Sequence, residues 1–211
     1  MKLKINHLYI VSLLGIVGGF LNGYTYIYRG KVFATMQTGN IILGSIKLLE
    51  KDYVKVFRYL MPIISFCIGI LLALLIIRKL KEKSCLKILL VEILCLFSIS
   101  FIGSNQYDIY ITSIISFVAG LQLESFSKIN DIVFATTMCT GNLRSLCGCI
   151  FNSIMERKFN KKTITYLCII ISFAIGVCLS SISILFMKQY SLLVCVLLLF
   201  IIYICIRFNN E

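Results

Sequence analysis

The sequence predicts an all-α integral membrane protein with about six transmembrane helices and two short broken or re-entrant segments. Of its 211 residues, 59% are hydrophobic and only 14% are charged, whereas roughly a quarter are charged in a soluble domain. The apolar residues form long runs without charge, of 19 residues between Arg58 and Arg78 and 25 between Lys162 and Lys188. About 20 helical residues cross a hydrocarbon core of roughly 30 Å. These runs therefore predict a single membrane domain over residues 1–211.

The candidate spans follow from the apolar runs and the charged gaps between them. We expect membrane-spanning helices at about 8–27, 59–77, 86–103, 109–125, 165–186 and 191–206. The N-terminal apolar run lacks a prompt cleavage site, so we interpret it as an uncleaved first span. Two further segments are apolar but short for a crossing, and they are rich in Thr, Gly, Asn and Gln; they cover about 32–47 and 132–150.

The two short segments are copies of one motif. Residues 32–40 read VFATMQTGN and residues 133–142 read VFATTMCTGN, with one residue added between VFAT and TGN. Upstream, the triplet that begins at Gly19 corresponds to the one that begins at Gly120 at a matching distance. Such a duplication predicts two repeats, at about 8–103 and 109–206.

The Lys and Arg residues predict how the chain is oriented in the membrane. If the two short segments dip in and return, six spans remain, with 14 basic residues on the side of the N-terminus and 7 on the other. If both segments cross, the split is 12 against 9, and the basic run 78–87 falls outside. The positive-inside rule favours the first arrangement, with a cytoplasmic N-terminus. Three spans per repeat would invert the second repeat relative to the first, as in many secondary transporters.

These motifs resemble those of the YoaK family, small multi-pass bacterial membrane proteins grouped under a domain of unknown function. The shared motifs are GGFLN in the first span, VFATMQTGN, and GLQ followed by ATTMCTGNLRS, and the resemblance covers nearly the whole chain. It implies a bacterial cytoplasmic (inner) membrane protein of about six spans, described as a transporter without an established substrate. Family members commonly have Asp-Ala after the first GGFL, where this chain has Asn22-Gly23. An acidic role at that position is therefore not expected here.

The TGN motifs form the candidate solute site. We expect Gly39 and Gly141 to interrupt the helix, with neighbouring Thr or Asn side chains capping helices that begin at Ile41 and Leu143. Two helix N-termini at membrane depth would offer partial positive charge to a polar or anionic solute. The candidate solute-binding residues are Thr38, Gly39, Asn40, Gln122, Thr140, Gly141, Asn142 and Arg144. In the alternative interpretation, Gly and Thr let continuous helices pack closely, and Arg144 reaches from a loop to the interface.

Two acidic residues within the apolar runs are candidates for proton coupling. Glu92 lies five residues into an uncharged run, and Glu124 lies near the end of the next span. A charge at the bilayer centre costs about 2.5–3.5 kcal/mol, so such groups usually face a cavity or a partner. Alternatively, Glu92 is an interfacial residue paired with Lys87 or Lys83.

The sequence favours a secondary carrier or channel for a small polar or anionic solute; the alternative is a non-transporting integral membrane component of a complex. The basic residues are spread over the gaps between apolar runs, which indicates contact with anionic lipid in the bilayer rather than nucleic acid. His7 is the only histidine, and no CxxC, HExxH or GxSxG motif is present. We therefore expect no metal site, no cofactor and no enzymatic activity.

Overall fold

The protein is almost entirely helical in the computed structural model, which describes residues 8–81, 84–104, 107–129, 132–158, 160 and 162–209. The helices are α1 (Leu8–Tyr28), α2 (Gln37–Leu49), α3 (Tyr53–Leu80), α4 (Ser84–Ile99), α5 (Asp108–Ser125), α6 (Thr140–Met155), α7 (Lys162–Met187) and α8 (Leu192–Asn209). A two-residue antiparallel ladder pairs β1 (Lys128–Ile129) with β2 (Ile132–Val133), and a 3-10 turn, η2 (Lys188–Ser191), joins α7 to α8. The predicted helical class is therefore confirmed, apart from this short ladder.

The long helices agree with the predicted spans within a few residues, and α3 differs most. It begins at Tyr53 rather than near residue 59, because the Asp52 carboxylate caps it by accepting a hydrogen bond from the Lys55 N–H at 3.2 Å. α4 ends at Ile99 rather than near residue 103. Charge spacing therefore located the apolar middle of each helix better than its ends.

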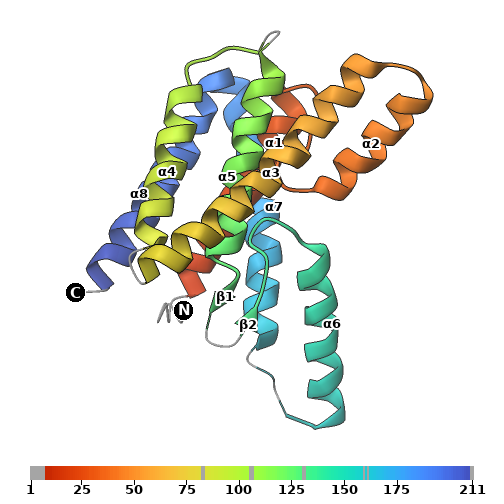
Figure 1. Cartoon of the computed structure of the whole chain (residues 1–211). Helices are drawn as coiled ribbons and strands as arrows, with labels where there is room; N and C mark the ends of the chain where they lie inside the picture. Colours follow the sequence, from red (N-terminus) through yellow and green to blue (C-terminus); the bar gives the residue numbers. More distant parts are fainter. Residues whose placement is uncertain are drawn as a thin grey trace.

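Helices from distant parts of the chain lie side by side in the bundle (Figure 1). α1 packs along α7, and α3 packs along α5. α4 and α8 pack against each other, while α4 also contacts α5 and α8 also contacts α1. α2 and α6 each lie beside the helix that follows them in the chain. From the middle of the molecule, α2 runs towards one end and α6 towards the opposite end (Figure 1).

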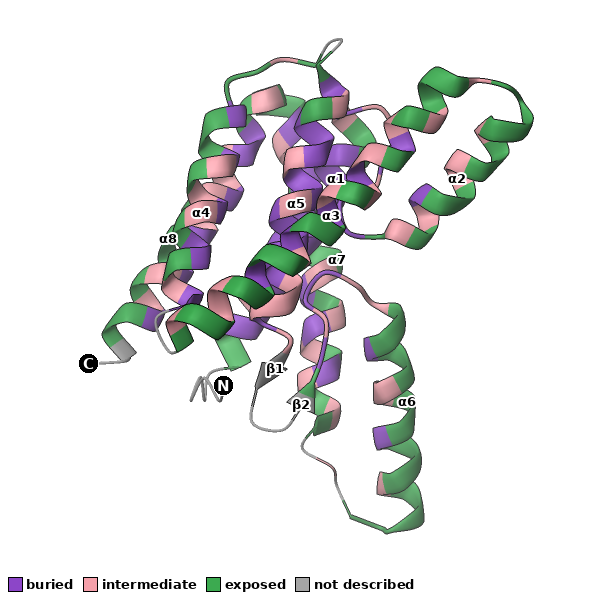
Figure 2. Cartoon of the chain, viewed as in Figure 1, coloured by how far each residue is buried: buried purple, intermediate pink, exposed green. Residues whose placement is uncertain are grey.

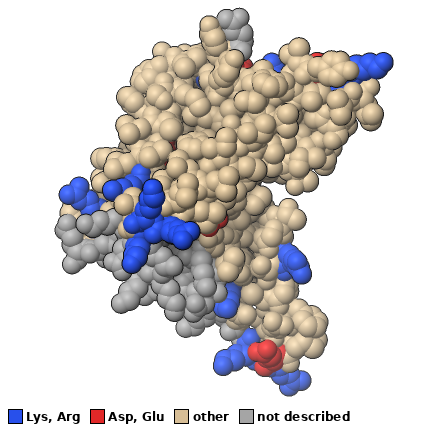
Figure 3. All heavy atoms as spheres, viewed as in Figure 1, with Lys and Arg blue, Asp and Glu red and all other residues tan. Residues whose placement is uncertain are grey.

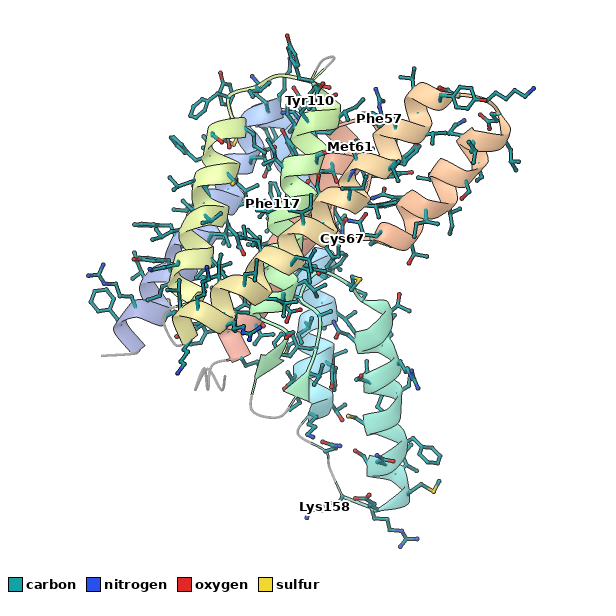
Figure 4. All side chains as sticks on the ribbon, in the orientation of Figure 1. Phe57, Met61, Cys67, Tyr110, Phe117 and Lys158 are labelled. Atoms are coloured by element: carbon teal, nitrogen blue, oxygen red, sulfur yellow. The ribbon has the colours of Figure 1, made fainter. Side chains whose placement is uncertain are left out.

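Glycines bring the backbones of the two long helix pairs together. A Cβ on Gly19 of α1 would lie 2.0 Å from the Phe173 carbonyl oxygen, and one on Gly176 of α7 would lie 2.1 Å from a backbone oxygen of α1. Gly69 and Gly120 make the corresponding contact between α3 and α5. Figure 4 shows Phe117 of α5 beside α3, and its carbonyl oxygen faces Gly69 at this contact. Small residues that permit such approach are typical of helix packing in membranes.

The core follows α1 and α5, whereas α2 and α6 are mostly exposed (Figure 2). Of the apolar window in α1, 72% is buried, against 22% of the window in α3. Within the described residues, three stretches are long and apolar enough to cross a membrane: Leu8–Tyr28, Tyr53–Leu80 and Lys162–Phe208. The third stretch includes two helices, α7 and α8, because η2 reverses the chain between them.

Exposed basic side chains form two separate groups in the lower half of the view in Figure 3, one at the left and one at the lower tip, and others lie at the upper right. The two groups come from separate regions of the chain, and include Arg78, Lys79, Lys81 and Lys87 in one and Arg157, Lys158 and Lys162 in the other. The two predicted basic loops, which are separated by about 70 residues of sequence, therefore lie in the same half of the molecule but form separate groups.

Candidate functional site

Two unwound segments, residues 29–36 and 134–139, lead into α2 and α6 and meet inside the bundle. The Thr35 hydroxyl donates a hydrogen bond to the Thr137 carbonyl oxygen at 2.5 Å. Asn22 of α1 binds Thr35 through two hydrogen bonds. Its Oδ1 accepts from the Thr35 N–H at 3.0 Å, and its Nδ2 donates to the Thr35 hydroxyl. Both threonines are fully buried, so this polar contact is shielded from the surroundings of the protein.

Gln122 of α5 makes a similar attachment to the second unwound segment. Its Nε2 donates to the Thr136 hydroxyl at 3.2 Å and to the Leu14 carbonyl oxygen at 3.0 Å. The segment can pass this close to α1 because Gly18 has no side chain; a Cβ there would lie 2.5 Å from the Thr136 carbonyl oxygen. We use the name "the crossing" for the buried set Asn22, Thr35, Gln122, Thr136 and Thr137.

Two polar atoms of the crossing have no hydrogen-bond partner among the described residues. They are the Oε1 of Gln122 and the hydroxyl of Thr137. An unpaired polar group in a buried position costs free energy comparable to a lost hydrogen bond. Together they provide an acceptor and a hydroxyl that could bind a small polar molecule.

The TGN motifs themselves lie within the first turns of α2 and α6. α2 begins at Gln37 after Met36, and α6 begins at Thr140 after Cys139, with no side-chain cap in either case. The expected helix starts at Ile41 and Leu143 were therefore wrong. The break lies upstream of each glycine, in the unwound segment, because that segment is held by another interaction.

That interaction is made by the asparagine of each TGN motif. Asn40 Oδ1 accepts from the Phe33 N–H at 2.9 Å, and its Nδ2 donates to the Phe33 carbonyl oxygen at 2.7 Å. Asn142 binds Ala135 in the same way, at 3.1 and 2.6 Å. We call each pair of bonds an Asn clasp. These amides satisfy the backbone of the unwound segments, so their hydrogen-bonding capacity is largely used within the protein.

The structure brings only part of the predicted solute-binding set to the crossing. Gln122 lies there, and Asn40 and Asn142 hold the segments that form it. Gly39 is half-buried against the Phe33 ring. The other predicted residues are exposed on the first turns of α2 and α6: Thr38, Thr140, Gly141 and Arg144.

The two acidic candidates have different environments. Glu124 is half-buried near the end of α5. Glu92 is fully buried in the middle of α4, and Lys87, one of its expected partners, is exposed. The other expected partner, Lys83, lies outside the described residues, as does His7.

Sequence reasoning missed Thr35, Thr136 and Thr137, the residues that meet at the crossing. The VFAT repeat contained the signal, because Thr35 and Thr136 are its equivalent positions. The repeat could not indicate that the two copies touch. Asn22 was noted only as a departure from the family pattern, whereas it holds Thr35 in place.

Metal-ligating side chains are not clustered in the described part of the chain, where no three His, Cys, Asp or Glu residues are placed to hold an ion. Cys85, Cys149 and Cys195 are buried free thiols. Polar side chains and backbone are thus the groups available at the crossing.

A bundle of long apolar helices around a buried polar contact defines the protein as a multi-helix membrane protein. The chain belongs to the family described as "Protein of unknown function (DUF1275)", whose family model matches residues 10–205. It is similar to the UPF0700 transmembrane protein YoaK of Bacillus subtilis (strain 168), with 26% identity over 178 residues, or 79% of each chain. No solved structure matches it. The family resemblance predicted from the motifs is confirmed.

Proposed function

We propose that this protein is a membrane transporter, a secondary carrier or channel, for a small polar or anionic solute that binds at the crossing. The observation that supports this most directly is the contact between Thr35 and Thr137, which joins two unwound segments inside the bundle. Non-helical backbone at membrane depth is tolerated only where it is buried in protein or lines a water-filled cavity. Transporters commonly form their binding sites from such interrupted helices.

The proposal includes six membrane crossings arranged as two inverted repeats, at about 8–103 and 109–206. In the first repeat α1, α3 and α4 would cross, and in the second α5, α7 and α8, with α2 and α6 as re-entrant helices. The packing supports this pairing, because α1 meets α7 through Gly19 as α5 meets α3 through Gly120. The opposite directions of α2 and α6 fit an inverted relation. The cytoplasmic side would then be the half that holds the basic loops.

The expected solute chemistry follows from the groups around the crossing. α2 begins two residues after Thr35, and α6 begins three residues after Thr137, so the positive ends of both helix dipoles lie beside the site. These ends favour an anionic or acceptor group, while the Gln122 Oε1 needs a hydrogen-bond donor. A small solute with both kinds of group would satisfy the crossing.

Uptake into proteoliposomes tests the proposal, with a panel of small anionic, neutral polar and cationic solutes. Thr35→Val removes the hydroxyl at the crossing with little change in shape and should reduce uptake at least tenfold. Thr38→Val is the matched control, because Thr38 is exposed and should leave uptake unchanged. Equal uptake by the two variants, each shown to be folded by size-exclusion chromatography, would exclude the crossing as the solute site.

Arg144→Gln addresses the predicted fixed cation. If Arg144 attracts anions from its exposed position on α6, the variant should lose anion uptake and keep uptake of neutral solutes.

A non-transporting membrane component remains the second candidate. The close backbone contact of α1 with α7 at Gly19 and Gly176 favours this candidate, because it is a dry and fixed form of packing. Absence of uptake for the whole panel, with binding of a partner membrane protein in detergent, would support this candidate.

A further inference from the structure

We propose that Glu92 binds a proton inside the membrane and is a neutral carboxylic acid in the seam between α4, α5 and α8. Glu92 is fully buried at the middle of α4, and neither carboxyl oxygen has a hydrogen-bond partner among the described residues. α4 packs against both α5 and α8. An ionised carboxylate without a partner is far less stable in a buried position than its protonated form.

Among the described residues, no Lys or Arg side chain forms an ion pair with the Glu92 carboxyl group. No described Lys or Arg nitrogen lies within 4.0 Å of its carboxyl group, and Lys87 is exposed. The titratable groups in the surrounding core are thiols and phenols, those of Cys85, Cys95, Cys195, Cys205, Tyr24, Tyr28 and Tyr203. The charged residues of the packed helices lie near the helix ends: Lys55, Arg58, Arg78 and Lys79 of α3, Asp108 and Glu124 of α5, and Arg207 of α8.

A second unpartnered group lies at a similar depth on α5. The hydroxyl of Ser116 is fully buried and has no hydrogen-bond partner among the described residues. The register of α4 against α5 is fixed by Cys85, whose Sγ lies 3.9 Å from the Ser125 carbonyl oxygen. Glu92 is seven residues along α4 from this contact and Ser116 nine residues along α5, which corresponds to about 10 and 14 Å. A carboxyl and a hydroxyl therefore share one level of the bundle.

In the proposed repeats, the residue equivalent to Glu92 is apolar, which argues that packing does not require an acid there. Gly69 and Gly176 are equivalent contacts, 107 residues apart. The same spacing relates Glu92 of α4 to Leu199 of α8, which is also fully buried. At this position the second repeat therefore has the apolar Leu199, and only the first repeat has an ionisable residue, Glu92.

Labelling with dicyclohexylcarbodiimide, an apolar reagent that reacts with protonated carboxyls, tests the proposal on the full-length protein in liposomes. Mass spectrometry should find the adduct on Glu92, and labelling should fall as the pH is raised to alkaline values. A water-soluble carbodiimide with an amine nucleophile should instead label Glu124, which is half-buried, and spare Glu92. Absence of the apolar adduct on Glu92 at every pH would overturn the proposal.

Infrared spectroscopy provides a second readout. Glu92→Gln should remove a carboxylic-acid C=O band at neutral pH. Loss of a carboxylate band instead would show that Glu92 is ionised and would also overturn the proposal. If Glu92→Gln does not fold, Glu92→Leu copies the apolar residue of the second repeat and serves for the same comparison.

A role of the Glu92 proton in transport rests on the proposed function. The protonation of Glu92 itself does not. If Glu92 couples proton movement to uptake, Glu92→Gln should flatten the pH dependence of uptake at least threefold while solute binding at the crossing is kept. A labelled Glu92 without any uptake would leave the proton site standing and reject the transporter. Uptake with unchanged pH dependence would reject the coupling role of Glu92.

Discussion

Arg29 at the end of α1 and Asp108 at the start of α5 form a buried ion pair, with Nη1 2.8 Å from Oδ1. The guanidinium is fully buried and also donates to the Tyr24 hydroxyl at 3.0 and 2.7 Å and to the Gly103 carbonyl oxygen at 2.8 Å. The hydroxyl of Ser104 donates to the other carboxylate oxygen at 2.7 Å. This network fixes the central helices of the two halves to each other at one end of the bundle.

Removing one partner of this pair should destabilise the protein strongly. Asp108→Ala leaves the Arg29 charge buried without a counter-ion, and we expect a loss of about 3–5 kcal/mol in the free energy of unfolding in detergent. Glu50→Ala is the control, because Glu50 pairs with Lys47 at the surface, where such pairs contribute about 0–1 kcal/mol. Similar losses for the two variants would mean that the buried pair has no special role.

The glycines at the helix contacts should not tolerate a methyl group. Gly19→Ala places Cβ against the Phe173 backbone, and we expect a loss of about 1–3 kcal/mol or failure to fold. Gly148→Ala in α6 meets nothing within 4 Å and should be neutral or stabilising by up to about 1 kcal/mol. Thermal unfolding in detergent compares them. A harmless Gly19→Ala would argue against close contact of α1 with α7.

The Asn clasps should control the unwound segments. Asn40→Asp keeps an acceptor for the Phe33 N–H but loses the donor to the Phe33 carbonyl oxygen, at about 0.5–1.5 kcal/mol per lost bond. We expect faster amide hydrogen exchange in residues 29–36, measured by mass spectrometry. Thr38→Ala is the control, because Thr38 is exposed. Unchanged exchange in Asn40→Asp would show that the segment is held by other contacts.

The six-crossing arrangement predicts the sides on which the turns lie. Lys51 lies in the turn between α2 and α3, and Lys158 lies in the turn between α6 and α7 (Figure 4). Compartment-specific reporters fused after them should report opposite sides, with Lys51 outside and both Lys158 and Lys83 inside. A cytoplasmic Lys51 would contradict both the topology and the inverted repeats.

The sequence was most informative where a physical property repeats along the chain. Uncharged runs located the long helices, and the VFAT and TGN copies located both unwound segments, because length and duplication are local signals. The contact of Thr35 with Thr137 depends on the packing of helices from distant parts of the chain, so spacing alone could not predict it. Arg29 illustrates the same limit, because its spacing in the sequence does not indicate that Asp108 and Tyr24 bury it.

The burial of α1 has a consequence for the order in which the protein is made. α1 is synthesised well before its main neighbour, α7, which begins at Lys162. Until α7 is synthesised, the face of α1 that carries Gly15, Gly19 and Gly23 lacks the helix against which it packs in the final fold. Its glycine-rich face is then available for other helices. Assembly of this bundle is therefore completed late, after translation of the second half.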